Sequence, residues 1–407
     1  MTSMINPECL WRDLLIHAGF GEKAAGGAGD LATAEWITRE LERLGYEVER
    51  LRIPVPLFQP CRCEVVGSNC ALELFPQPVV VPTTDEGIAA PLALVHSVSD
   101  AAAAQGRIAI ILLPYARHAA IWTSVAAPLL TAVAEAGALA VVILPFGPTG
   151  EIVGLNSYAD KPFIPIPVAI GRPSDLAAYA GMASANLTVR LYLTGENRVG
   201  DSPTLMARRH RGVRWIAMST PRSGFFTCSV ERGTGTATFL WLAAWLPKAF
   251  PDHSLFLLNS GAHELRFAGT HSALDLAPSA GVTDMWAHIG AGLVSRAYTT
   301  IRGGRRLDTA DPNRICMTTP SLAVQARAAF SGLAGLDDPQ PILSEVGELS
   351  TIVERGYDKA FACLGVNRSC HTRLDVSDEV TPDLLASVVE GHRRLIEMAV
   401  APAGRSG

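Results

Sequence analysis

The sequence has no long apolar segment and little excess of charge of either sign. Its most apolar runs, Arg107–Pro114 and Ala138–Pro145, are far shorter than the about 20 residues that a membrane-spanning helix needs, so we expect no membrane segment. The 34 basic and 39 acidic residues leave a net charge of −5, which provides no basic surface for nucleic acid or for a membrane. Met1–Trp11 lacks a basic segment followed by an apolar one, so we expect no signal peptide.

Cysteine is sparse, with eight residues in a chain of 407. Cys61, Cys63 and Cys70 form no Cys-x-x-Cys pair, and we interpret them as small buried hydrophobic residues rather than as a zinc knuckle. This use of cysteine is typical of a reduced protein and predicts a cytoplasmic location. Apolar residues make up 48% of the chain and charged residues only 18%, which excludes general disorder. The length predicts two or three domains.

Three segments of different character follow one another along the chain. An apolar face repeats through Asp30–Leu44, which predicts a helix capped by Asp30, and a strand is expected over 46–55. Short β-rich runs and Pro-rich turns follow, with a helix expected over 119–136. We therefore predict an N-terminal part of the catalytic domain at 1–58, an inserted β-rich domain at 59–205, a catalytic α/β domain at 206–400 and a flexible tail at 401–407.

Beyond about residue 206, strands and helices alternate. Buried strands are expected at 213–219, 254–259 and 285–290, and helices at 235–246, 269–276, 319–331 and 382–398. This alternation favours an α/β fold with a mostly parallel mixed sheet and helices on both faces. Ligands of such sheets bind beyond the carboxyl ends of the strands. The polar residues found there are Thr220, Arg222, Glu231, His263, Glu264, His288 and His371. Carboxylates and imidazoles together predict a metal site with an adjacent acid or base.

The order of these residues resembles that of the aminopeptidase-like zinc hydrolases, a family that includes the glutaminyl cyclases. The segments that carry the resemblance are Glu42–Val48, Ser219–Ser223, Glu231–Gly235, Ala262–Thr270, Ala287–Gly290 and His371–Asp375. The resemblance implies a zinc-exopeptidase-like fold. It also implies that the insertion is similar to a protease-associated domain, with Gly106–Ala109 and Ala136–Ala138 in matching places.

Three of the family's metal-binding positions are changed here. In the family's register the first histidine ligand falls on Thr220, its aspartate partner on Arg222, and a later aspartate ligand on Ala287. The resemblance therefore implies one divalent metal rather than two. The ligand set that it implies is Glu231, Glu264 and His371. Zinc suits three such ligands with an open fourth position, and iron or manganese would suit two carboxylates and one imidazole as well.

Four further residues receive roles from the same register. His263 falls on the general-base position, and a neutral imidazole can accept a proton from water or from an attacking amine. Glu348 is expected to anchor a substrate amine or relay a proton, and His288 is a further catalytic candidate. Arg222 is expected to pair with Glu231 or to bind a substrate carboxylate. Structural roles stay open for the three histidines, His263 could be a fourth ligand, and Glu231 is favourable at a helix start even without a metal.

Three functions are compatible with this pattern. The first is a metal-dependent hydrolase of the aminopeptidase-like class that acts on a small amide, peptide or amino-acid derivative. The second is a cyclase or lyase of specialised metabolism that uses the same pocket. The third is an inactive binding protein, because three family positions are lost. The expected partner is a small molecule or a peptide, with no nucleic acid and no membrane, and the sequence leaves oligomerisation open.

Overall fold

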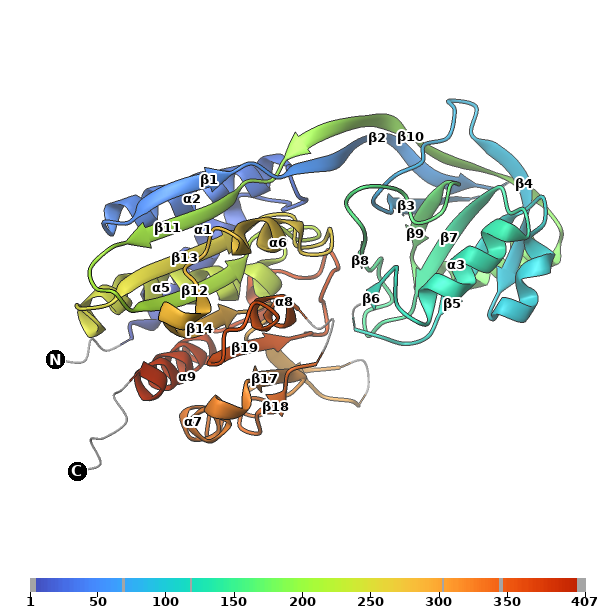
Figure 1. The fold of residues 1–407 in the computed structure, drawn as a ribbon. Helices are drawn as coiled ribbons and strands as arrows, with labels where there is room; N and C mark the ends of the chain where they lie inside the picture. The colour runs from blue at the N-terminus through green and yellow to red at the C-terminus, as the bar shows by residue number, and fades with distance from the viewer. Residues whose placement is uncertain (1–4, 68–69, 118, 302–303, 344–346, 401–407) are drawn as a thin grey trace.

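The computed structural model describes residues 5–67, 70–117, 119–301, 304–343 and 347–400. Figure 1 shows two units, one built on an open sheet and one on a barrel, joined by the long strands β2 and β10. The tail that we predicted at 401–407 lies outside the described residues.

The larger unit is built on an eight-stranded sheet. Its four central strands, β13, β12, β14 and β19, are parallel to one another, and antiparallel strands flank them on both sides. The predicted α/β class with a mostly parallel mixed sheet is confirmed. In sheet order the strands are β1 (Glu47–Leu51), β11 (Thr204–Arg209), β13 (Ser254–Ser260), β12 (Trp215–Pro221), β14 (Thr283–Ile289), β19 (Ala360–Gly365), β17 (Arg314–Thr318) and β18 (Gln340–Pro341).

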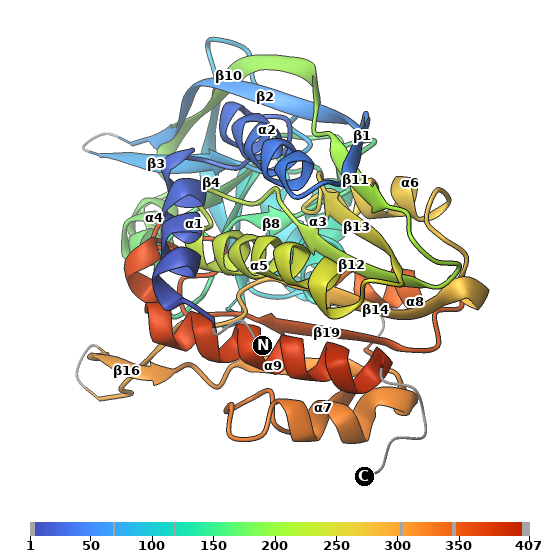
Figure 2. The same cartoon turned by 90° about the vertical axis from the view of Figure 1, so that its left-hand side faces the viewer.

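Helices cover both faces of this sheet, because its central strands bury side chains on each side. Ile216 and Met218 of β12 pack into the core beneath one set of helices, while Ala217 between them packs into the core on the other face. The first set is α1 (Pro7–Gly19), α2 (Ala28–Arg43), α5 (Thr234–Ala249), α7 (Ala323–Ala329) and α9 (Pro382–Val400), of which α5 and α9 lie side by side in Figure 2. The second set is α6 (Ala268–Leu274) and α8 (Leu349–Val353). None of the helices in the described ranges has the length and apolar character needed to cross a membrane.

The second unit is a closed barrel of seven strands. Its strands begin at Pro54 and end at Asp201, whereas the insertion that we predicted has the bounds 59–205. In barrel order they are β10 (Thr188–Asp201), β2 (Pro54–Val66), β3 (Ala71–Pro76), β9 (Val168–Gly171), β7 (Ala140–Pro145), β5 (Ile108–Leu113) and β4 (Ile88–Val95). Helices α3 (Ala126–Glu135) and α4 (Leu176–Ser184) belong to the same unit.

The helix expected over 119–136 begins seven residues late, at Ala126. Ala119–Ala120 instead forms a short strand, β6, which pairs with β8 (Leu155–Asn156). The local apolar pattern could not indicate this, since the pairing partner lies more than 30 residues further along the chain. Two other short strands, β15 (Arg296–Tyr298) and β16 (Arg306–Ala310), pair with each other beside the main sheet.

The stability of the protein is expected to fall at mildly acidic pH, partly because of His392 in α9. This side chain is fully buried, its Nδ1 donates to Val388 O at 2.8 Å, and burial lowers its pKa to about 4. An unfolded histidine titrates near 6.5, so the unfolded chain takes up the proton first as the pH falls. The contribution of His392 to the free energy of unfolding is therefore fully present above about pH 6.5 and falls progressively toward pH 4. At pH 5 the loss is about 2 kcal/mol.

Urea unfolding of the wild type and of His392→Phe at pH 7 and pH 5 measures this contribution. Phe330 and Phe361 contact the imidazole, at ring-centroid distances of 5.3 and 5.8 Å, so an aromatic replacement suits the site. The variant should lose less stability than the wild type between the two pH values. Equal losses would show that His392 does not carry the effect.

Candidate active site

The carboxyl ends of the parallel strands meet at the edge of the sheet that faces the barrel. A cavity of about 450 Å³ lies there, and both units line it. The main unit contributes Glu231, His263, Phe267, His288, Cys370 and His371, and the barrel unit contributes Ala120, Trp122, Thr123, Ser124 and Asn156. The edge predicted from strand order is therefore where the candidate residues gather, and the barrel unit closes its far wall.

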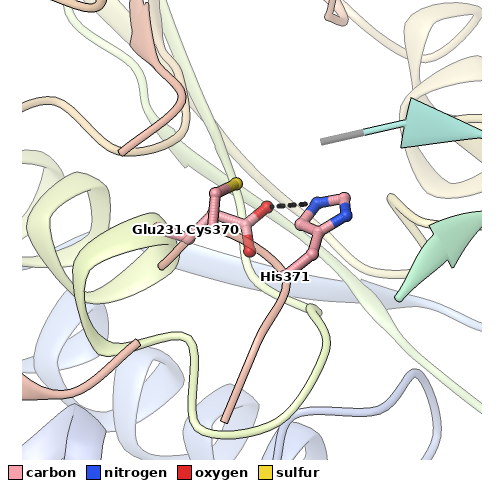
Figure 3. Close-up of side chains that lie close together, drawn as sticks. All are labelled: Glu231, Cys370 and His371. Carbon is pink, nitrogen blue, oxygen red and sulfur yellow. Dashed lines mark hydrogen bonds and ion pairs between the residues drawn. The ribbon is translucent and has the colours of Figure 1, made fainter. Parts of the chain in front are cut away.

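Glu231, Cys370 and His371 form a buried cluster at this cavity (Figure 3). One potential ligand atom from each residue lies within 4.8 Å of the others. Glu231 sits in a π-helical turn, Ser229–Gly233, directly before α5, and such turns are frequent at functional sites. Asp375 holds this turn, since its carboxylate accepts from the backbone N–H of Val230 at 2.5 Å and of Glu231 at 3.2 Å.

His371 is held in a strained and specific orientation. Its φ of 60° places it in the left-handed region, which is uncommon for residues other than glycine and occurs often at functional sites. Its Nδ1 donates to Gly154 O of the barrel unit at 2.8 Å, and its Nε2 lies 3.1 Å from Glu231 Oε1. Metal-binding histidines are commonly oriented by a carbonyl in this way. The ring nitrogen nearer the cluster is the one that a metal would use.

Glu231 and His371 each stabilise the charged form of the other. Burial would raise the pKa of Glu231, but the positive charges of Arg232 and His371 outweigh it and hold the pKa well below its usual range. Burial would lower the pKa of His371, but Glu231 outweighs it and the pKa is raised. Burial raises the pKa of the Cys370 thiol, and Glu231 adds to this effect. Burial and Glu231 together raise the pKa of Asp375 to about 7.

Glu264, which we predicted as the third metal ligand, lies outside this cluster. Its Oε1 accepts from Arg232 Nη2 at 2.7 Å, and its Oε2 accepts from Ser223 Oγ at 2.6 Å. Cys370 stands with Glu231 and His371 instead. The predicted ligand set of Glu231, Glu264 and His371 stays a prediction. A buried arginine that we had not considered, Arg232, lies between the carboxylates of Glu231 and Glu264.

Arg232 and Cys370 are the site residues that the sequence interpretation missed. Arg232 lies in the turn before α5, where the helix dipole disfavours a cation. An arginine in that position indicates that an anion compensates it, and this signal was present in the sequence. Cys370 gave no comparable signal, since a lone cysteine is usually a small hydrophobic residue.

His263 and Glu348 form a hydrogen-bonded pair. His263 Nδ1 donates to Glu348 Oε1 at 2.7 Å, and Ser260 Oγ also donates to this carboxylate, at 3.0 Å. Burial would raise the pKa of Glu348, but the hydrogen bond and charge of His263 outweigh it and bring the pKa to about 2. Because Nδ1 carries the proton, neutral His263 presents an unprotonated Nε2. Glu348 is fully buried and does not line the cavity, so it supports His263 rather than anchoring a substrate amine.

His288 lines the same cavity as a neutral imidazole. Burial lowers its pKa to about 4. Trp286 Nε1 donates to Ser219 Oγ at 2.8 Å, and Ser219 Oγ lies 2.8 Å from His288 Nδ1. The indole can only donate, so the hydroxyl proton of Ser219 is available for Nδ1. When Ser219 donates to Nδ1, the proton of neutral His288 is on Nε2, where it can donate a hydrogen bond.

Arg222 is a structural residue, which corrects the substrate-binding role that we predicted. Its side chain is fully buried, and its Nε donates to Asp30 Oδ1 at 2.7 Å. Its other nitrogens donate to Asn259 Oδ1 at 2.8 Å and to Pro203 O at 2.5 Å. Asp30 is correspondingly not a helix cap: it lies inside α2, which begins at Ala28. Arg222 does not line the cavity and does not pair with Glu231.

Arg222→Met is expected to destabilise the protein by about 3–5 kcal/mol, because it leaves the buried Asp30 carboxylate unpaired. The control is Arg50→Ala, since Arg50 pairs with Glu35 on the surface, where the side chains are 43% and 50% exposed. That variant should lose less than about 1 kcal/mol. Urea unfolding measures both values, and similar losses for the two variants would contradict a structural role for Arg222.

Among the described residues, the buried cluster at this site has side chains that fit a metal ion. Glu231, Cys370 and His371 offer oxygen, sulfur and nitrogen, a donor set that suits zinc with one position open. Glu231 Oε2 is buried without a hydrogen-bond partner in the described part of the chain, so it has a lone pair to give. At two positions that the resemblance implied for ligands of a second ion, Ala287 packs into the core and Thr220 offers only a hydroxyl.

Solved structures with the same fold include zinc aminopeptidases and a related peptidase. The zinc aminopeptidase BSAP from Bacillus subtilis superposes with a TM-score of 0.76 at 16% identity, over 97% of this chain and 95% of that chain. The aminopeptidase from Aneurinibacillus sp. strain AM-1 gives 0.70 at 16% identity, over 97% and 94% of the two chains. A peptidase M28 precursor from Shewanella amazonensis gives 0.72 at 15% identity, over 96% and 92%.

These likenesses establish the fold. They extend over nearly the whole chain, and the zinc-exopeptidase-like architecture expected from the motifs is confirmed. No protein-family model and no curated protein sequence matches the chain.

Proposed function

We propose that this protein is a metal-dependent hydrolase that uses a single divalent ion to cleave a small amide or peptide. The observation that carries the proposal is that a possible metal-binding cluster and a possible general base line the same cavity. A buried carboxylate–thiol–imidazole cluster of Glu231, Cys370 and His371 lines one part, and the His263 imidazole backed by Glu348 lines another. The similarity in fold to a zinc aminopeptidase also supports this proposed function.

Glu231, Cys370 and His371 would hold the ion. When bound, it would act as a Lewis acid toward a substrate oxygen. Gly154 O orients the His371 imidazole by accepting a hydrogen bond from Nδ1, and Asp375 holds the turn that carries Glu231. The site would be complete only with the barrel unit in place, because that unit supplies the carbonyl that orients His371.

His263 would be the general base. Its Nε2 can accept a proton from an attacking water, and the Glu348 carboxylate at 2.7 Å stabilises the imidazolium that results. His288, with its proton on Nε2, would donate a hydrogen bond to the oxygen on which negative charge develops. Each of these groups acts in a mostly buried site, where electrostatic interactions are stronger than in water.

Cyclisation is a second candidate, because an imidazole base serves an attacking amine as well as water. Two measurements separate the possibilities. Metal analysis of protein purified without added zinc gives the number of ions per chain, and mass spectrometry of the products from amino-acid anilides and N-terminal glutaminyl peptides separates hydrolysis from ring closure. Protein that binds no divalent metal and turns over neither substrate would refute both and favour a binding protein.

A further inference from the structure

We propose that the guanidinium of Arg232 is a permanent internal cation that takes the place of a metal ion between the buried carboxylates of Glu231 and Glu264. The inference deepens the single-ion site of the proposed function.

The first support is geometric. Arg232 Nη2 lies 2.9 Å from Glu231 Oε1 and 2.7 Å from Glu264 Oε1, so a single nitrogen bridges the two carboxylates. Its Nε donates to Ser223 O at 2.5 Å, and Ser223 Oγ in turn donates to Glu264 at 2.6 Å. A metal ion shared by these two carboxylates would need the same space. The guanidinium therefore excludes it.

The second support is burial. The Arg232 side chain is 0% exposed, and the side chains of Glu231 and Glu264 are only 3% and 6% exposed. Buried charges of this kind must be paired, and two carboxylates this close need a cation between them. Because these side chains are buried, water cannot screen the repulsion between the two carboxylates. A fixed positive charge from the chain itself makes the pair stable before any metal arrives.

The third support is that arginine cannot release its charge. A guanidinium stays protonated under all ordinary conditions, whereas a lysine in such a site can shift its pKa and become neutral. The Arg232 Nη1 group is buried and has no hydrogen-bond partner among the described residues. A side chain chosen only for hydrogen bonding would not leave that group unsatisfied, so the charge is the property that the site uses.

The consequence is that removing the guanidinium should create a second cation site. Arg232→Gln keeps a polar side chain of moderate size but leaves Glu231 and Glu264 without their shared cation. Zinc should then bind there as the replacement. Arg232→Lys keeps a positive charge and should not gain an ion.

The experiment compares zinc bound per chain in wild type, Arg232→Gln, Arg232→Lys and Arg232→Gln/Glu264→Gln, after equilibrium dialysis against a series of zinc concentrations. Arg232→Gln should bind one ion more than the wild type, and zinc should raise its melting temperature more than that of the wild type. The double variant should lose this gain because one carboxylate is gone. Arg222→Gln is the matched control, since it removes another fully buried arginine and should gain no ion.

The outcomes separate this inference from the proposed function. A wild type with no ion and an Arg232→Gln variant with one would refute the single-ion function and support the inference. One ion in both proteins would support the function and overturn the inference. If Arg232→Gln folds only when zinc is added, the inference is supported. If it stays unfolded with zinc while the double variant folds, the inference is overturned.

Discussion

His371→Ala is expected to abolish tight zinc binding, together with any metal-dependent activity. The imidazole is one of the three donors that converge in the cluster among the described residues, and its Nε2 is the donor next to Glu231. Loss of a residue that merely orients a ligand lowers metal affinity about 10–100-fold. Loss of a ligand itself should therefore exceed that range, because two protein donors and solvent remain.

Competition against a chromophoric zinc chelator measures the affinity directly and does not depend on a substrate. His288→Asn is the matched control, because His288 lines the same cavity but is held by Ser219 and lies outside the cluster. This control should retain its zinc. Wild-type affinity in His371→Ala would show that the ion, if present, is held elsewhere.

His263→Ala is expected to lower kcat by about 10²–10⁴ while leaving the zinc content and KM nearly unchanged. The residue lies outside the donor cluster and lines the cavity, and its Nδ1 is bound to Glu348, which leaves Nε2 to accept a proton. Removing a general base slows the chemical step without removing substrate contacts. The effect should thus appear in kcat.

Glu348→Gln tests the supporting role of the carboxylate. The amide oxygen can still accept from His263 Nδ1, but the negative charge that stabilises the imidazolium is lost. A smaller loss of kcat than in His263→Ala is expected, with KM and zinc unchanged. If His263→Ala instead releases zinc, His263 is a fourth ligand. If neither variant alters turnover, the pair is structural and the base must be sought at His288.

Much of the fold followed from local patterns. Apolar runs alternating with amphipathic segments after residue 206 predicted the parallel sheet, because such a sheet buries both faces of its strands. The same strand order predicted the edge where Glu231, His263 and His371 gather, since parallel strands end on one side. Where pairing was non-local, as for β6 with β8, the local pattern predicted the wrong element.

The sequence by itself determined which residue types reach the site, and the tertiary structure decided which of them pair. Arg222 pairs with Asp30 across a sequence separation of 192 residues. For His263 with Glu348 the separation is 85 residues, and for Arg232 with Glu264 it is 32 residues. A charge at a strand end is visible in the sequence, but its partner is whichever buried opposite charge lies within about 3 Å, a contact distance that only the folded chain sets. For that reason Arg222, which we expected at the site, supports the fold, and Arg232, to which we had given no role, lies between the carboxylates of the site.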